Sequence, residues 1–304
     1  MPAASFRLPG ASLFVETNEE RLLVLARRLW EETAPAPRRD AELHAAWTAT
    51  SGPRPELLPE RRLTWTLLPE VYSAEIPGHL AARITFEPPS VVGAVSLSLL
   101  EAFPSTVARY LLEAPLAALL GARRHQPLHA GAVIGPRGAV VIRGGSGAGK
   151  STLVAAAWQA GLGVLGDESL LVSREDPDDL SSTVRDLTLL PHAARLLGLE
   201  TLCELAFSGG EEKRRIDLFP GATPSDRIAR RRATVLLGPR TPGPARLVPL
   251  TPEEFVTEFR HGEIPQERAT GNPDFVARAW SAARAFRLEG ALDLPGAVSL
   301  IASL

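Results

Sequence analysis

The sequence GGSGAGKS at Gly144–Ser151 is the feature that most constrains the fold of this chain. It matches the pattern G-x-x-x-x-G-K-[ST] in full. An apolar run, Ala139–Arg143, precedes it, and a helical pattern, Ser151–Ala160, follows it. The sequence therefore predicts a strand, a phosphate-binding loop and a helix in direct succession.

Each residue type in this loop has a physical role in holding a nucleotide. Glycines allow positive φ angles and let backbone N–H groups approach phosphate oxygens, and the N-terminus of the helix favours anions. Lys150 would reach the β- and γ-phosphates, the Ser151 hydroxyl would bind Mg²⁺, and Thr152 would contact the α-phosphate. The alternative is a glycine-rich turn that only caps a helix. The predicted site for ATP and Mg²⁺ consists of Gly144, Gly145, Ser146, Gly147, Ala148, Gly149, Lys150, Ser151 and Thr152.

The composition excludes several other functions. The chain has 304 residues, 45% of them hydrophobic, and a net charge of −2, so it lacks the basic excess of a nucleic-acid-binding protein. No apolar run is long enough to span a membrane, and the first residues do not resemble a signal peptide. The single cysteine excludes an internal disulfide framework and a cysteine-based metal site. We therefore expect a cytoplasmic protein without nucleic-acid or membrane partners.

Lysine is scarce: only Lys150 and Lys213 occur among 33 basic residues. A compact ammonium and a planar guanidinium are not interchangeable at a tight site. The two lysines are therefore candidates for positions where arginine will not serve.

Hydrophobic periodicity predicts α/β structure along the whole chain. In the first 120 residues we expect a helix at Glu19–Trp30, capped by Thr17 or Asn18, and helical pieces within Leu97–Leu120 that are broken by prolines. The predicted strands are Arg62–Leu68, Leu80–Phe86, Leu128–Ile134, Ala139–Arg143, Gly163–Leu165, Val184–Leu190 and Thr234–Leu237, and the predicted later helices are Pro252–His261 and Asp274–Phe286.

Two acidic residues, Asp167 and Glu168, follow the strand after the glycine-loop helix. A carboxylate there would face the γ-phosphate, where it could hold Mg²⁺ or accept the proton of an attacking hydroxyl. The alternative is a solvated loop that happens to begin with two acids.

Leu128–Ala130 (LHA), Gly144–Ser151 and Asp167–Glu168 together resemble the catalytic domain of HPr kinase/phosphorylase and its relatives. The spacings, 15 residues from His129 to Gly144 and 23 from Gly144 to Asp167, fit that family. The resemblance implies a catalytic set of Asp167 as base, Glu168 in place of a second Asp, His129 near the phosphates, and Lys150. From their places in the glycine loop and at the end of the following strand, Ser151 and Asp167 are the predicted metal ligands. Without the resemblance, His129 would equally well be a buried strand histidine.

The chain is most similar to the HPr-kinase-like proteins found with ribosomally made peptides, such as lasso-peptide kinases. The resemblance covers roughly residues 120–304. It implies an HPr kinase/PEP carboxykinase-like P-loop domain at 121–304, with a mixed twisted sheet. A smaller α/β domain at 1–120, a candidate for substrate recognition, would precede it. HPr kinase forms hexamers, so a homo-oligomer is also implied.

Three basic residues are candidates for contacts with substrate or phosphate. Lys213 and Arg214 stand where those relatives have a Lys-Arg pair, and Arg185 is a weaker candidate. The alternative for the pair is a solvated charge run. HPr kinase/phosphorylase itself has a Glu-Ile-Arg-Gly signature where this chain has Thr183–Asp186 (TVRD), so the resemblance supports neither phosphorylase activity nor HPr as substrate.

The sequence thus predicts an ATP-dependent kinase that transfers the γ-phosphate to a hydroxyl, with a peptide serine as acceptor. Two alternatives remain open: a kinase for an amino acid or a sugar on the same fold, and a non-catalytic nucleotide-binding partner protein. Chemistry like that of PEP carboxykinase is disfavoured because no histidine- and lysine-rich manganese site is present. No motif in the sequence identifies the acceptor, the oligomeric state or the role of residues 1–120.

Overall fold

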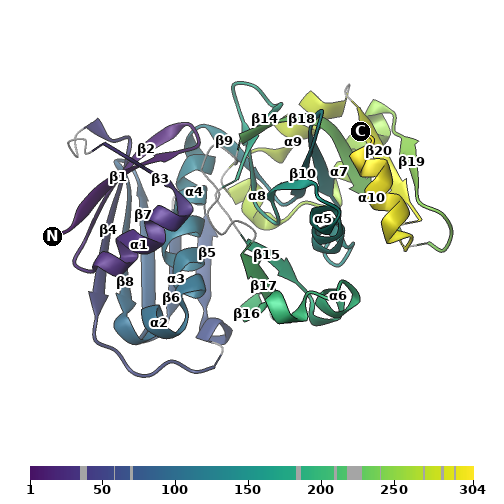
Figure 1. The fold of residues 1–304 in the computed structure, drawn as a ribbon. Helices are drawn as coiled ribbons and strands as arrows, with labels where there is room; N and C mark the ends of the chain where they lie inside the picture. The colour runs from purple at the N-terminus through teal and green to yellow at the C-terminus, as the bar shows by residue number, and fades with distance from the viewer. Residues whose placement is uncertain are drawn as a thin grey trace. The chain divides into compact units, whose positions relative to one another are not determined.

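The computed structural model describes residues 1–34, 40–57, 59–68, 71–182, 186–208, 211–217, 228–239, 241–269, 271–281, 284–290 and 292–304. The chain divides into two compact units (Figure 1). The first comprises Met1–Arg124 together with Leu205–Lys213, and the second holds the rest of the described chain from His125 onward. Both units are mixed α/β structures.

The first unit is built on an eight-stranded mixed sheet in the order β3-β1-β2-β4-β8-β7-β6-β5. The β2–β4 and β4–β8 pairs are parallel, and the other described pairs are antiparallel. The strands are β1 (Ala3–Leu8), β2 (Ala11–Thr17), β3 (Glu31–Thr33), β4 (Leu43–Thr50), β5 (Thr64–Leu68), β6 (Val71–Ile76), β7 (Leu80–Phe86) and β8 (Pro89–Ser96).

Helices cover one face of this sheet. They are α1 (Glu20–Leu29), α2 (Leu97–Ala102), α3 (Pro104–Val107), a π-helical segment (Ala108–Glu113) and α4 (Ala114–Arg123). The helical pieces predicted within Leu97–Leu120 are thus present. The predicted cap of α1 was wrong: Glu19, not Thr17 or Asn18, is the N-cap, because its carboxylate accepts from the Arg21 backbone N–H. Thr17 instead accepts from the Glu19 N–H.

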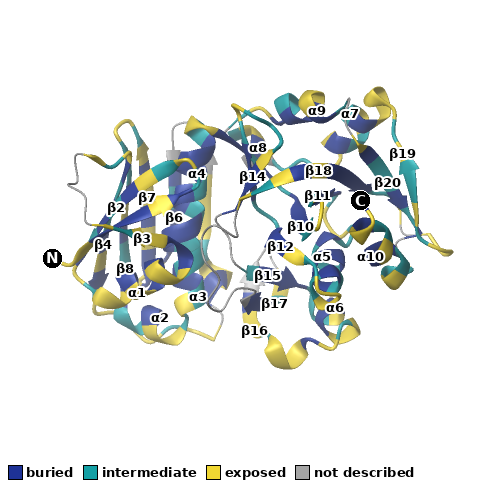
Figure 2. Cartoon of the chain, turned by 45° about the horizontal axis from the view of Figure 1, so that its top comes forward, coloured by how far each residue is buried: buried dark blue, intermediate teal, exposed yellow. Residues whose placement is uncertain are grey.

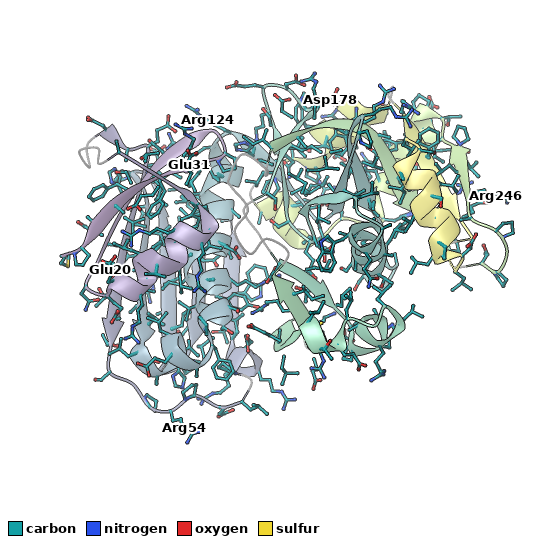
Figure 3. The ribbon with its side chains drawn as sticks, viewed as in Figure 1. Glu20, Glu31, Arg54, Arg124, Asp178 and Arg246 are labelled. Atoms are coloured by element: carbon teal, nitrogen blue, oxygen red, sulfur yellow. The ribbon has the colours of Figure 1, made fainter. Side chains whose placement is uncertain are left out.

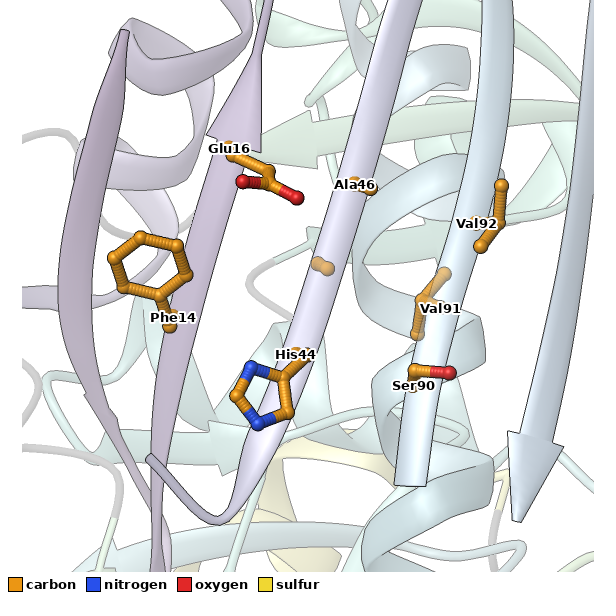
Figure 4. A pocket seen from close by; sticks show the side chains of 8 residues that line it. Phe14, Glu16, His44, Ala46, Ser90, Val91 and Val92 are labelled. Carbon is orange, nitrogen blue, oxygen red and sulfur yellow. The ribbon is translucent and has the colours of Figure 1, made fainter. Parts of the chain in front are cut away.

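The opposite face of the sheet is half exposed, as the alternation of buried and exposed residues along its strands shows (Figure 2). A shallow hollow of about 80 Å³ lies there between β2, β4 and β8. Phe14, Glu16, His44 and Val92 line it (Figure 4). Small-molecule sites usually enclose roughly 300–1,000 Å³, so this hollow is too small for a nucleotide.

The second unit contains a nine-stranded sheet with the path β12-β10-β11-β18-β14-β13-β9, and β20 pairs with both β18 and β19. Its strands are β9 (His125–Leu128), β10 (Gly131–Gly135), β11 (Gly138–Arg143), β12 (Gly163–Gly166), β13 (Leu170–Ser173), β14 (Asp179–Ser181), β18 (Ile228–Leu237), β19 (Arg246–Pro249) and β20 (Ala285–Glu289). A separate three-stranded sheet has the order β15-β17-β16, with β15 (Asp186–Leu189), β16 (Glu204–Ser208) and β17 (Glu211–Asp217).

Apolar cores lie on both faces of the nine-stranded sheet. The helices are α5 (Lys150–Gln159), α6 (Pro191–Leu196), α7 (Pro252–Arg260), α8 (Pro265–Ala269), α9 (Pro273–Ser281) and α10 (Leu294–Ala302). Val140 and Ile142 of β11 pack in the core that holds α5 and α10, whereas Val141 packs in the core that holds α7 and α9. Because side chains alternate along a strand, Arg143 shares the face of Val141 and points towards α7.

Two predicted elements of the second unit were wrong. Leu128–Ile134 is not one strand, because β9 pairs with β13 while β10 pairs with β11 and β12, and His129 lies in the break between them. The helix predicted at Asp274–Phe286 ends at Ser281, and Phe286 belongs to β20, opposite Val235 of β18. A short apolar run fits both the two-residue period of a strand and the 3.6-residue period of a helix. The local pattern alone therefore does not decide between the two.

Within the described ranges, no helix combines the length and the apolar character that a membrane crossing requires.

Candidate functional site

The glycine loop connects β11 directly to α5. Gly147 and Gly149 have φ angles of +75° and +103°, in the left-handed region that favours glycine. Apart from its two chain neighbours, no atom of the described residues lies within 4 Å of where a Cβ on Gly147 would be, so backbone conformation, not lack of space, favours glycine there. Gly149 is the N-cap of α5, and the positive end of the helix dipole therefore faces the loop.

Lys150 is buried and folds back onto the loop that precedes it. Its Nζ donates to the carbonyl oxygens of Gly144 (2.8 Å) and Gly145 (3.2 Å). Burial lowers the pKa of the Lys150 ammonium, and the nearby carboxyl groups of Asp167 and Glu168 partly offset this effect. The ammonium is thus held at the loop by backbone carbonyls.

Asp167 follows β12 directly and is only 1% exposed. Its Oδ2 accepts a long hydrogen bond from the Thr188 N–H (3.5 Å), and its Oδ1 has no hydrogen-bond partner among the residues that the structure describes. Burial, and secondly the negative charge of Glu168, raise the pKa of Asp167 to about 7, although the Ser151 hydroxyl acts in the opposite direction. A carboxyl group with such a pKa can accept a proton near neutral pH.

Glu168 follows Asp167 in the chain, and His129 contacts the Glu168 backbone. Glu168 has a φ of +65°, the only positive value for a non-glycine residue in the described chain. The His129 Nδ1 is 3.2 Å from the Glu168 carbonyl oxygen. Because a carbonyl only accepts, Nδ1 carries the proton of this bond, which leaves Nε2 of the neutral ring as an acceptor. Burial and the charge of Lys150 lower the pKa of His129, so the neutral ring prevails at neutral pH.

Arg143 and Glu267 belong to the same site, and sequence reasoning missed both. They form a buried two-point ion pair, with Nη1–Oε1 and Nη2–Oε2 distances of 2.7 and 2.9 Å. An arginine at the end of an otherwise apolar strand was a signal, because a buried charge needs a partner. Nothing in the sequence pointed to Glu267 in α8 as that partner, since it lies 124 residues away.

The three predicted substrate-contacting residues do not form a described cluster with the loop. Lys213 belongs to the stretch grouped with the first unit, and its Nζ lies 3.3 Å from Glu211 Oε2. Arg214 is paired with Leu189 in the β15–β17 ladder, one residue along β15 from Thr188. Arg185 lies outside the described residues.

Arg230 and Arg231 of β18 make ion pairs within the protein. Arg230 is exposed and pairs with Asp176 and Asp179 at 2.8 and 2.9 Å. Arg231 is buried against the Trp280 ring and pairs with Asp178 at 2.7 Å; Asp178 is labelled in Figure 3. Both guanidinium groups are thus bound by carboxylates of the protein.

No protein-family model matches the sequence, and no curated protein matches it. Among solved structures, the chain is similar to the Hpr(Ser) kinase/phosphatase from Coxiella burnetii, with a TM-score of 0.24 and 16% identity. The similarity covers 41% of this chain and 78% of that chain.

Proposed function

We propose that this chain is an ATP-dependent kinase that transfers the γ-phosphate to a hydroxyl group, with a serine of a peptide as the acceptor. The observation that supports this most is Asp167. It is a buried carboxyl group with a pKa near 7, next to the hydroxyl of the glycine loop's last residue, Ser151. A carboxyl group that can accept a proton at that point fits transfer of a phosphoryl group to a hydroxyl.

The residues present fit Mg·ATP. The left-handed glycines and the α5 N-terminus form a cradle for phosphates, and Lys150 supplies a buried positive charge beside them. No three His, Cys, Asp or Glu side chains come together as a metal site in the described part of the chain. This fits Mg²⁺, which is usually held by one or two protein ligands plus substrate phosphates. Ser151 and Asp167 would be those ligands.

When bound, Mg·ATP would supply the phosphoryl group and the metal that offsets its charge. The residues of the chain would do the rest. The loop and Lys150 would hold the phosphates, and Asp167 would take the proton from the acceptor hydroxyl. The neutral His129 would present Nε2 towards the reacting groups, and the Glu168 carbonyl would hold the other side of its ring. Positioning and electrostatics are the main sources of catalysis in phosphoryl transfer.

The choice of a peptide serine rests on the resemblance of the Leu128–Ala130, glycine-loop and Asp167–Glu168 motifs to the peptide-tailoring kinases. The composition of the sequence supports the further proposal of a cytoplasmic location, and the resemblance to HPr kinase supports that of a homo-oligomer.

A direct test is to incubate the protein with Mg·ATP and a panel of acceptors, then measure their masses. The panel should contain serine peptides, free amino acids and sugars. We expect one phosphate on a peptide serine. If only a free amino acid or a sugar were phosphorylated, the acceptor would be a small molecule and not a peptide. Tight Mg·ATP binding with no phosphorylated acceptor would favour a non-catalytic partner protein.

A further inference from the structure

We propose that Arg143 and Glu267 are positioning residues whose ion pair fixes His129 for phosphoryl transfer; the inference rests on the proposed kinase function. Neither residue would touch the nucleotide. Their effect would pass through the backbone of His129.

The pair is well placed for this role because it is fully enclosed. The Arg143 and Glu267 side chains are 0% and 2% exposed, and their two parallel contacts form a bidentate pair. Charge-assisted bidentate bonds fix orientation as well as distance. The pair therefore behaves as a rigid joint between the end of β11 and α8.

The pair holds the peptide groups on both sides of His129. Glu267 Oε1 accepts from the His129 backbone N–H. Arg143 Nη1 donates to the His129 carbonyl oxygen at 3.2 Å. Gln126, three residues earlier, donates from Nε2 to the Glu267 carbonyl at 3.0 Å. With the ring bonded to Glu168, His129 is thus fixed at its backbone and at its side chain.

Arg143 is committed to the protein and is not a phosphate ligand. Its Nε donates to the Phe259 carbonyl (2.9 Å), and its guanidinium lies 4.2 Å from the centre of the Phe259 ring. With the bonds to His129 and Glu267, four of its five N–H groups are used. Gly262 allows this approach, because a Cβ there would lie 3.0 Å from Arg143 Cγ.

The first experiment compares Glu267→Gln with Glu263→Gln. Glutamine keeps the size of Glu267 but removes the charge that holds Arg143 and His129. We expect kcat to fall about tenfold or more, with the Kd for Mg·ATP within about twofold, because the loop contacts remain. Glu263→Gln is the matched control: it removes an ion pair to the exposed Arg268 on the same segment and should change neither value. A weaker Kd with unchanged kcat would overturn the inference.

A double-mutant cycle separates positioning from general support of the fold. In a His129→Ala background, Glu267→Gln should lower kcat by less than about twofold, because the group it positions is gone. An equal loss of kcat in both backgrounds would show that Glu267 acts independently of His129, contrary to the proposal.

If Glu267→Gln does not fold, the double variant Arg143→Met/Glu267→Leu provides the test. Replacing a whole buried ion pair by apolar residues often preserves stability. We expect wild-type-like thermal unfolding but a kcat that stays low. Recovery of kcat together with stability would refute the positioning role.

Histidine NMR on the nucleotide-free protein tests the inference apart from the kinase proposal. The His129 ring signal is assigned by its loss in His129→Ala. Glu267→Gln should shift it, and Glu263→Gln should not. This holds even if the wild-type protein phosphorylates no acceptor, a result that would count against the proposed function alone. A His129 signal that stays in place in Glu267→Gln would overturn the inference.

Discussion

Lys150 is one of two lysines in a chain that otherwise uses arginine, and its surroundings explain why a lysine suits the position. The ammonium fits between two carbonyl oxygens of the loop, at 2.8 and 3.2 Å, in a buried space. A planar guanidinium is larger and cannot make the same point contact.

We therefore expect Lys150→Arg to weaken Mg·ATP binding about tenfold or more, equal to about 1.4 kcal/mol or more. Isothermal titration calorimetry measures this. Lys213→Arg is the matched control, because an arginine there can still pair with Glu211. The Kd of this variant for Mg·ATP should stay within about twofold of the wild-type value. Equal affinity of wild type and Lys150→Arg would contradict the role given to Lys150.

Asp167→Asn should abolish phosphoryl transfer and leave the Kd for Mg·ATP within a few-fold. The amide keeps the shape of the side chain, and its oxygen can still contact Mg²⁺, but it cannot accept the hydroxyl proton. Acceptor phosphorylation by mass spectrometry and nucleotide titration, done on the same preparation, measure both properties. Undiminished transfer in this variant would refute the assignment of Asp167 as the base.

The raised pKa of Asp167 also makes stability depend on pH. The folded protein keeps this proton up to about pH 7, whereas the unfolded chain releases it near pH 4. The wild type therefore loses stability as the pH rises from about 4 to about 7. In metal-free buffer at pH 8, Asp167→Asn should be more stable by on the order of 1–4 kcal/mol, and this advantage should shrink as the pH is lowered. Denaturant titrations at several pH values measure it. A stability difference between Asp167→Asn and the wild type that does not change with pH would contradict the raised pKa of Asp167.

At this scale the sequence could predict only side chains that lie within short motifs. The loop, Asp167 and His129 could be predicted because the spacings between them fit those of a known family. Glu267 could not be predicted, since what defines it is a contact with Arg143 that forms only after folding.

At the scale of elements, strong periodicity located β7 and α1, whereas weakly patterned elements were misplaced. The apolar stretch around His129 suggested one strand, but its two ends pair in different parts of the sheet. The break occurs at His129, whose N–H and C=O bond to Glu267 and Arg143 and not to a neighbouring strand. Backbone partners from distant segments leave no trace in local hydrophobicity.

Helix α7 offers a prediction at this scale. Thr251 and Glu254 form a capping box at its start, and the helix carries Phe259 to Arg143. Thr251→Ala should destabilise the protein by about 1 kcal/mol, because the cap of the Glu254 N–H is lost. Chemical denaturation measures this. Thr257→Ala, an exposed mid-helix change in α7, should be neutral or slightly stabilising. Equal losses in both variants would argue against a specific effect of the cap.

At the scale of the whole molecule, the division into units falls between Arg124 and His125, where α4 and β9 are separated by one residue. The resemblance to the kinase family predicted a domain boundary between residues 120 and 121, in the same region. The grouping of Leu205–Lys213 with the first unit had no such signal, because it depends on contacts between segments far apart in the chain.

All residues assigned to the nucleotide site, together with Arg143 and Glu267, belong to the second unit, which has its own apolar cores. A fragment of residues 125–304 should therefore bind Mg·ATP within about tenfold of the full-length affinity. If residues 1–124 recognise the acceptor, the fragment should phosphorylate the peptide with a much higher KM. Calorimetry and steady-state kinetics measure the two effects. An unchanged KM for the peptide would remove the first unit from acceptor recognition.

The ion pair between Arg143 and Glu267 also has a consequence for biosynthesis. The two residues are 124 positions apart, so a ribosome adding about 5–20 residues per second takes roughly 6–25 s to get from one to the other. For most of that interval the nascent chain carries the complete glycine loop but lacks Glu267, which holds His129 in place. Any translational pause between the codons of Arg143 and Glu267 therefore lengthens the time for which Arg143 is charged and its ion pair with Glu267 cannot yet form.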